Sequence, residues 1–229
     1  MATATLPGGL TLNYQEWGRP DGAAVLLLHG LASSSDSWKR MAPVLGRHFR
    51  CIAPDARGHG ASDWTEDYSF EAMRDDVVGL MSSLGVIGAI AYGHSMGALT
   101  AYLLAATQPE LVRMLVLEEI PPPDAAVPPR PVPRRPRPGG SYDWRAELAV
   151  NRWRNADHPE WWGYAEQVGV ESLVLGGRQS HLPQDRLQDL ASRLPHGRFE
   201  AFDLGHNLHE DRPGEVLTVV EPFLSTLAK

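Results

Sequence analysis

The sequence has very little cysteine and no long apolar run. Cys51 is the only cysteine among 229 residues, which excludes an internal disulfide and a thiolate metal site. No apolar stretch approaches the roughly 18 residues that a membrane-spanning helix needs. The N-terminal residues MATATLPGGL lack the basic and apolar regions of a signal peptide. These absences predict a soluble cytoplasmic protein that neither spans a membrane nor holds a metal.

Basic residues are scarce relative to acidic ones. Lys and Arg number 21 against 28 Asp and Glu, which gives a formal net charge of -7 at pH 7. Such a balance argues against nucleic acid as a partner. With 43% apolar residues, the chain can bury one sizeable core and is not disordered as a whole. We expect a small-molecule partner, and the sequence leaves the oligomeric state open.

Short apolar runs alternate with longer amphipathic segments. Residues 24–28 (AVLLL) are apolar throughout, as in a strand covered on both faces. The longer segments repeat apolar residues every three or four positions, which is typical of helices with one buried face. This order predicts a mostly parallel sheet with helices on both faces. Strands are expected at 10–17, 24–28, 50–54, 89–92, 112–117, 172–175 and 198–203, and helices at 37–47, 70–84, 96–107, 184–194 and 214–227.

One segment interrupts the alternation. Residues 121–138 contain nine prolines and four arginines, so neither a helix nor a central strand is expected there. Residues 142–167 have a helical pattern and hold four of the seven tryptophans. We expect residues 121–167 to form an inserted cap, either a lid over a site or a small packing unit. Residues 1–120 and 168–229 are then the core.

The pattern Gly-X-Ser-X-Gly occurs at residues 93–97, with Ser95 at its centre. An apolar strand enters it and a helical segment leaves it, which is the setting in which this motif presents a nucleophile. Gly93 and Gly97 allow the chain to reverse tightly. The amides at the start of the helix point toward the serine, where negative charge develops. The pattern therefore predicts that Ser95 is a catalytic nucleophile.

A serine hydroxyl is a poor nucleophile at neutral pH and needs a neighbouring base. Of the nine histidines, His206 follows the last predicted strand. Loops at the carboxyl ends of parallel strands gather at one edge of a sheet, so this loop is expected to face the Ser95 turn. His206 is the predicted base, and His209 is the alternative.

An oxyanion hole needs two convergent backbone amides. Met96, which follows the serine, is expected to supply one, and Leu31, in the loop after the strand at 24–28, the other. His29 is expected to support that loop.

Four motifs resemble, in order and spacing, those of the α/β-hydrolase fold superfamily: 29–31 (HGL), 55–62 (DARGHGAS), 93–97 (GHSMG) and 205–206 (GH). The resemblance implies a mostly parallel, eight-stranded sheet with helices on both faces and a short cap inserted after the sixth strand. It also implies a triad of serine, acid and histidine, and no cofactor for hydrolysis. The turn at 55–62 is structural in this superfamily, and we expect Arg57 to brace it through an ion pair.

The acid departs from the superfamily's usual pattern. In most relatives it follows the seventh strand, but the corresponding loop, 176–183, contains no carboxylate. Glu118 and Glu119 stand after the sixth strand, similar to the pattern in haloalkane dehalogenases. Successive strand residues point to opposite sides, so only one of the two faces His206. The motif alignment favours Glu118, with Glu119 and Asp185 as alternatives.

A serine at position 95 favours acyl chemistry, since relatives that dehalogenate or open epoxides carry an aspartate there. We therefore predict a hydrolase of carboxylic esters, or of related acyl bonds, that works through an acyl-enzyme. An apolar pocket lined partly by the cap tryptophans predicts a small to medium hydrophobic substrate. Three other interpretations remain: a cofactor-free haloperoxidase or perhydrolase, a carbon–carbon bond hydrolase or lyase, and a ligand-binding protein with a relict triad.

Overall fold

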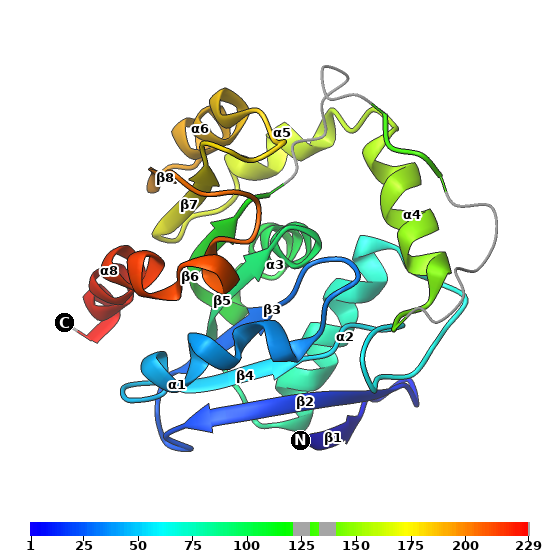
Figure 1. Cartoon of the computed structure of the whole chain (residues 1–229). Helices are drawn as coiled ribbons and strands as arrows, with labels where there is room; N and C mark the ends of the chain where they lie inside the picture. The colour runs from blue at the N-terminus through cyan, green and yellow to red at the C-terminus, as the bar shows by residue number, and fades with distance from the viewer. Residues whose placement is uncertain (121–128, 133–140, 229) are drawn as a thin grey trace.

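An eight-stranded sheet forms the centre of the computed structural model, which describes residues 1–120, 129–132 and 141–228. The strand order is β1-β2-β4-β3-β5-β6-β7-β8 (Figure 1). β2 pairs antiparallel with both β1 and β4, and every other pairing is parallel. The predicted fold class is confirmed. The strands are β1 (Ala2–Thr5), β2 (Thr11–Gly18), β3 (Ala24–Leu28), β4 (Arg50–Pro54), β5 (Ala89–His94), β6 (Val112–Glu118), β7 (Ser172–Gly177) and β8 (Gly197–Phe202).

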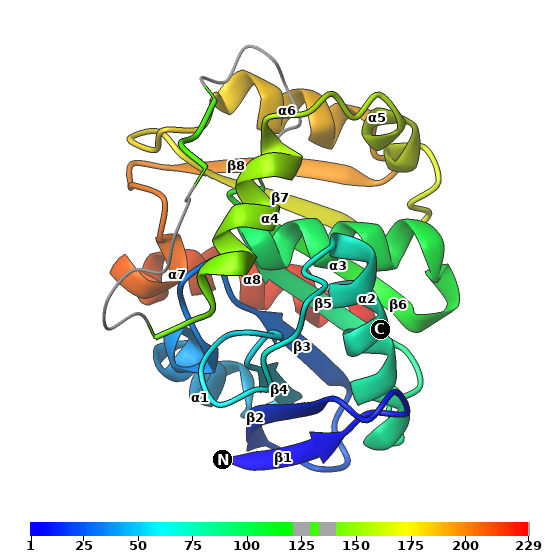
Figure 2. The same ribbon diagram turned by 90° about the vertical axis from the view of Figure 1, so that its right-hand side faces the viewer.

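Helices cover both faces of the sheet and bury a core on each (Figures 1 and 2). In β3, Val25 and Leu27 face one core and Leu26 and Leu28 the other, which explains why this run is apolar throughout. One face carries η1 (Ser35–Arg40), α1 (Ala42–Leu45) and α8 (Pro213–Leu224), and the other α2 (Phe70–Ser83), α3 (Met96–Thr107) and α6 (Gln184–Arg193). Shorter elements are η2 (Pro109–Leu111), α7 (Leu208–Asp211) and η3 (Ser225–Ala228). Among the described residues, no helix is long and apolar enough to cross a membrane.

The predicted helix at 37–47 is divided in two. The Ser34 hydroxyl accepts a hydrogen bond from the Asp36 amide and starts the 3-10 helix η1. α1 begins after Met41, with Pro43 in its first turn. Since proline favours the start of a helix over its interior, its position explains the new helical start.

Arg57 braces the loop after β4, as predicted. Its Nε and Nη2 each donate a hydrogen bond of 2.6 Å to the carboxylate of Asp76 in α2. The same guanidinium group also donates to the carbonyl oxygens of Asp67 at 2.8 Å and Ala72 at 3.1 Å. These bonds tie the loop to the start of α2.

Two helices, α4 (Trp144–Arg154) and α5 (Glu160–Ala165), lie between β6 and β7. α4 lies across the edge of the sheet at which the parallel strands end (Figure 2). The hydroxyl of Tyr102 in α3 donates to the Trp161 carbonyl at 2.8 Å, and the buried Trp161 ring packs against Trp153. Most of the predicted proline-rich loop at 121–138 lies outside the described residues, and the division into core and cap stays a prediction.

Candidate active site

The Ser95 turn joins β5 to α3 through a strained backbone. Ser95 has a φ of 52°, in the left-handed region that residues other than glycine rarely adopt. A Cβ at Gly93 would lie 2.2 Å from the Gly97 carbonyl oxygen, and a Cβ at Gly97 would lie 2.1 Å from the Leu28 carbonyl oxygen. Both positions therefore require glycine, as the motif predicted.

We expect Gly97→Ala to prevent folding or to lower the free energy of unfolding by about 3 kcal/mol or more. The added methyl group meets backbone atoms of Leu28 and His29, which cannot rotate away. The control is Gly163→Ala in α5, because nothing lies within 4 Å of a Cβ there and alanine stabilises a helix by roughly 0.5–1 kcal/mol over glycine. Urea denaturation measures both, and wild-type stability in Gly97→Ala would contradict the expected clash.

A chain of hydrogen bonds connects Ser95, His206 and Glu119. His206 Nε2 lies 3.1 Å from Ser95 Oγ, and His206 Nδ1 lies 2.8 Å from Glu119 Oε2. The His206 side chain is 24% exposed and the Glu119 side chain 0%. The predicted contact between Ser95 and His206 is therefore confirmed, and it has a buried carboxylate behind it.

The prediction that Glu118 contacts His206 is wrong, and Glu119 takes that place. β6 ends at Glu118, whose carboxylate accepts hydrogen bonds from His209 Nδ1 and the Tyr92 hydroxyl, both at 2.7 Å. The next residue, Glu119, has a φ of 51°. The strand therefore ends one residue later than expected, at Glu118. The left-handed backbone at Glu119 turns the chain there, so the two carboxylates reach different histidines.

The end of β7, the loop after it and the start of α6 supply hydrogen-bond donors to the acid. The Gly177 amide donates to Glu119 Oε1 at 2.6 Å, and the Ser180 hydroxyl donates to Glu119 Oε2. Gln184 Nε2 lies 3.4 Å from Glu119 Oε1. These hydrogen bonds hold the Glu119 carboxylate in a fixed orientation behind His206. Asp185, the other alternative, is exposed in the first turn of α6.

Glu118 and His209 form a second pair, in which both side chains are 0% exposed. Burial opposes the charge of Glu118, but His209 and the Tyr92 hydroxyl outweigh it and lower the pKa of Glu118 to about 2. The Trp38 ring stacks on the His209 ring at a centroid distance of 3.9 Å. His209 also donates its backbone amide to Glu118, at 3.1 Å. This pair anchors α7, the helix that begins just after His206.

His94, the second residue of the motif, holds the backbone of His206. Its Nε2 lies 2.9 Å from the His206 carbonyl oxygen. A carbonyl only accepts hydrogen bonds, so we assign the hydrogen to His94 Nε2. Burial lowers the pKa of His94 to about 3, which keeps the ring neutral. No sequence pattern predicts this role, because the position between Gly93 and Ser95 accepts many residue types.

The amides predicted for an oxyanion hole lie at two chain turns. Met96 is the first residue of α3, directly after Ser95, and Leu31 lies in the loop after β3. Among the described residues, neither amide takes part in a turn or cap hydrogen bond. Both are therefore candidates to bind an oxygen atom.

Two histidines support the loop that carries Leu31. His29 Nε2 accepts the Ala56 amide at 2.9 Å, and His29 Nδ1 lies 2.7 Å from the adjacent carbonyl oxygen. The predicted supporting role of His29 is confirmed. His59 Nε2 accepts the Ala32 amide at 3.2 Å, where the backbone is left-handed with a φ of 63°. Burial lowers the pKa of His59 to about 3, so its ring stays a neutral acceptor.

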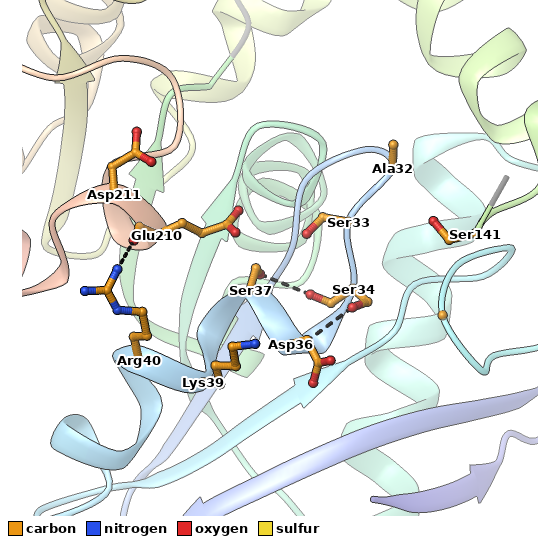
Figure 3. A pocket seen from close by; sticks show the side chains of 11 residues that line it. Ala32, Ser33, Ser34, Asp36, Ser37, Lys39, Arg40, Ser141, Glu210 and Asp211 are labelled. Atoms are coloured by element: carbon orange, nitrogen blue, oxygen red, sulfur yellow. Dashed lines mark hydrogen bonds between the residues drawn. The ribbon is translucent and has the colours of Figure 1, made fainter.

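A polar pocket of about 520 Å³ borders this loop (Figure 3). Its lining runs from Ala32 along η1 to Arg40, and faces Glu210 and Asp211 of α7. Arg40 Nη1 donates to the Glu210 carbonyl at 2.6 Å, which ties η1 to α7. Ser95 does not line this pocket, so the pocket does not contain the candidate nucleophile.

Other chemistry has little support among the described residues. Cys51 is buried, and burial raises the pKa of its thiol to about 12, so it is not a thiolate at neutral pH. Within the described ranges, no group of three or more His, Cys, Asp or Glu is placed to hold a metal ion. Ser95 is the nucleophile candidate that this geometry supports.

Comparison with known proteins identifies the family. The family model of the alpha/beta hydrolase fold matches residues 23–137, half of the chain. The chain belongs to the alpha/beta hydrolase fold family. It is 38% identical over 119 residues to the AB hydrolase superfamily protein YfhM of Bacillus subtilis, a match that covers 50% of this chain and 42% of YfhM. A 26% identical match over 252 residues to an sn-1-specific diacylglycerol lipase of Mus musculus covers 88% of this chain and 81% of the lipase.

Solved structures agree on the fold of this alpha/beta hydrolase. A thermophilic esterase from Thermogutta terrifontis superposes with a TM-score of 0.84, at 22% identity, over 100% of this chain and 99% of the esterase. At that identity the likeness shows the fold alone. The family and its lipase relative support hydrolase activity in general terms, and the particular reaction has to be inferred from the site.

Proposed function

We propose that this alpha/beta hydrolase is a serine esterase, which cleaves carboxylic esters or related acyl bonds through an acyl-enzyme. The observation that carries the proposal is the chain from Ser95 Oγ through His206 to Glu119, with contacts of 3.1 and 2.8 Å. This arrangement activates a hydroxyl for attack on a carbonyl carbon. The histidine accepts a hydrogen bond from the serine, and the carboxylate orients the histidine. The tight turn places that hydroxyl at the start of α3.

In the proposed reaction, His206 Nε2 takes the proton of Ser95 as Oγ attacks the carbonyl carbon. The same nitrogen then gives the proton to the leaving alcohol. Glu119 holds the hydrogen on His206 Nδ1 and stabilises the imidazolium. The amides of Leu31 and Met96 bind the oxyanion, with help from the positive end of α3. Water activated by His206 releases the acid, and no cofactor takes part.

The proposed substrate is a hydrophobic molecule of small to medium size. Trp153 and Trp162 are partly buried where the segment after β6 packs on the core, and α4 crosses the sheet edge that carries the site (Figure 2). We propose that residues 121–167 act as the cap over residues 1–120 and 168–229.

We also propose a cytoplasmic location, without nucleic-acid or membrane partners.

A fluorophosphonate probe tests the proposal directly. We expect it to label wild-type protein on Ser95, and we expect Ser95→Ala to lose both the labelling and the hydrolysis of 4-nitrophenyl esters. The loss in kcat should be about 10⁴-fold or more, by analogy with other serine hydrolases. A panel of acyl chain lengths then measures the size of the acyl site. Folded wild-type protein that stays unlabelled would contradict the proposal and favour a binding role.

Perhydrolase activity is the nearest alternative on the same residues. It is measured as peracid formed from acetate and hydrogen peroxide, beside ester hydrolysis by the same preparation. We expect hydrolysis to be the faster reaction. Faster peracid formation, abolished in Ser95→Ala, would replace the esterase proposal.

A further inference from the structure

Arg130 lies close to His206, and Arg154 lies next to Asn155, the residue that holds the Arg130 backbone. Arg130 Nη2 donates a hydrogen bond to His181 Nε2, and the His181 ring lies 4.7 Å from the His206 ring, measured between centroids. Arg154 is the last residue of α4, and its charge acts on both Arg130 and His181. A single imidazole therefore separates the Arg130 guanidinium from the proposed base.

The backbone around Arg130 is fixed to α4. The Arg130 amide donates to Asn155 Oδ1 at 2.9 Å, and Asn155 Nδ2 donates back to the Arg130 carbonyl at 2.9 Å. One turn earlier, Asn151 Nδ2 donates to the Pro131 carbonyl at 3.0 Å. Since Arg154 lies on the same helix, these bonds hold the backbone at Arg130 beside the end of the helix that carries Arg154.

Within the described part of the chain, neither arginine forms an ion pair with an acidic side chain, and both are half-buried. Burial lowers the pKa of Arg130, against the pull of Glu147. Burial and then the charge of Arg130 lower the pKa of Arg154 to about 10. By contrast, Arg145 of the same helix pairs with Asp143 at 2.7 Å.

This arrangement is unusual in an acidic protein. The chain has 28 acidic residues against 21 Lys and Arg, so carboxylates are plentiful. Two like charges held close together and partly out of water cost free energy unless an anion joins them. An anionic ligand would supply the negative charge that no carboxylate in the described part of the chain places beside these arginines.

We propose that the substrate carries a carboxylate beside its ester bond, and that Arg130 and Arg154 bind this carboxylate while the ester lies at Ser95. The inference names the substrate class of the proposed esterase and rests on that function. Planar guanidinium groups match a carboxylate with paired hydrogen bonds. Burial, followed by the charges of His206 and Arg130, lowers the pKa of His181 to about 4. His181 is thus a neutral acceptor that orients Arg130.

Matched esters that differ in charge test the proposal. Mono-4-nitrophenyl esters of succinic, glutaric and adipic acid are compared with their methyl esters, and 4-acetoxybenzoate with its methyl ester. The first set places the carboxylate on the acyl side and the second on the alcohol side. We expect at least one charged ester to exceed its neutral partner about tenfold to a hundredfold in kcat/KM. Added salt should reduce this preference.

Substitutions identify the groups responsible. Arg130→Gln and Arg154→Gln should each lower kcat/KM for the preferred charged ester at least about tenfold more than for its methyl ester. Arg130→Lys should restore part of the preference, because it keeps the charge. The matched control is Arg152→Gln, an exposed position two residues earlier on α4, which should leave the preference unchanged. A wild-type enzyme without preference for any charged ester would overturn the inference.

Binding to Ser95→Ala separates this inference from the proposed function. Calorimetry compares monomethyl glutarate with dimethyl glutarate, and we expect only the monoester to bind, more weakly after Arg130→Gln. Such binding supports the anion site even if no ester is hydrolysed and the esterase proposal fails. If neutral esters are hydrolysed through Ser95, but no charged ester is preferred in turnover and the monoester binds no better than the diester, the esterase proposal stands and the carboxylate site is wrong.

Discussion

Glu119→Gln is expected to lower kcat for ester hydrolysis by about 10³–10⁴-fold in a protein that remains folded. The glutamine amide cannot stabilise the imidazolium that forms on His206, and it favours the unproductive tautomer of that ring. Turnover of 4-nitrophenyl butyrate measures the effect, and circular dichroism verifies the fold. The Gly177 amide, which now donates to Glu119 Oε1, can still donate to the glutamine oxygen. The Ser180 hydroxyl, which now donates to Oε2, can rotate to accept from the glutamine NH2.

The matched control is Glu118→Gln, one residue earlier. Its partners are His209 and Tyr92, so we expect kcat within about tenfold of wild type and a loss of stability. Removing the charged partner from a buried, hydrogen-bonded pair costs about 3–5 kcal/mol, which a lower melting temperature reports. Turnover lost in Glu118→Gln but kept in Glu119→Gln would reverse the assignment of the acid.

Acidification from about pH 6.5 to pH 4 is expected to lower the free energy of unfolding by several kcal/mol. Burial lowers the pKa of both His59 and His94 from 6.5 to about 3. Between these values the unfolded chain binds more protons than the folded one, so stability falls as the pH falls. Each histidine adds a slope of up to about 1.4 kcal/mol per pH unit. Glu118, with its pKa lowered to about 2, adds a further loss below pH 4.5.

Urea denaturation between pH 7.5 and 4.5 measures this dependence. His59→Gln should flatten the slope, because a glutamine oxygen can accept the Ala32 amide without taking up a proton. His48 is exposed, so His48→Gln should leave the slope at its wild-type value. Equal slopes in all three proteins would show that the buried His59 ring is not a source of the acid sensitivity.

The sheet was largely predictable because a strand covered on both faces has a simple composition. The run at 24–28 shows this, with all five residues buried in β3. β1 could not be predicted in the same way. It has four residues at the edge of the sheet, and only Ala4 is buried, so its pattern is too short to distinguish from a loop.

The residues of the candidate site could be predicted where the order of the strands determines their position. They could not be predicted where a single backbone angle determines it. Ser95 and His206 follow the ends of parallel strands, which the fold brings to one edge. The choice between Glu118 and Glu119 depends on where β6 ends. The backbone at Glu119 is left-handed, but the sequence has no glycine there from which this conformation could be predicted. The amide of Gly177 was missed because every residue other than proline has one.

The register of the sheet has a consequence for protein engineering. His94 of β5 lies opposite Glu118 of β6, so Ser95 and Glu119 leave neighbouring, hydrogen-bonded strands. Their separation is set by the rigid ladder and does not depend on the conformation of the segment at 178–183. That segment can therefore be exchanged or lengthened to broaden substrate scope, provided that the hydroxyl of Ser180 and the imidazole of His181, which orients Arg130, are kept.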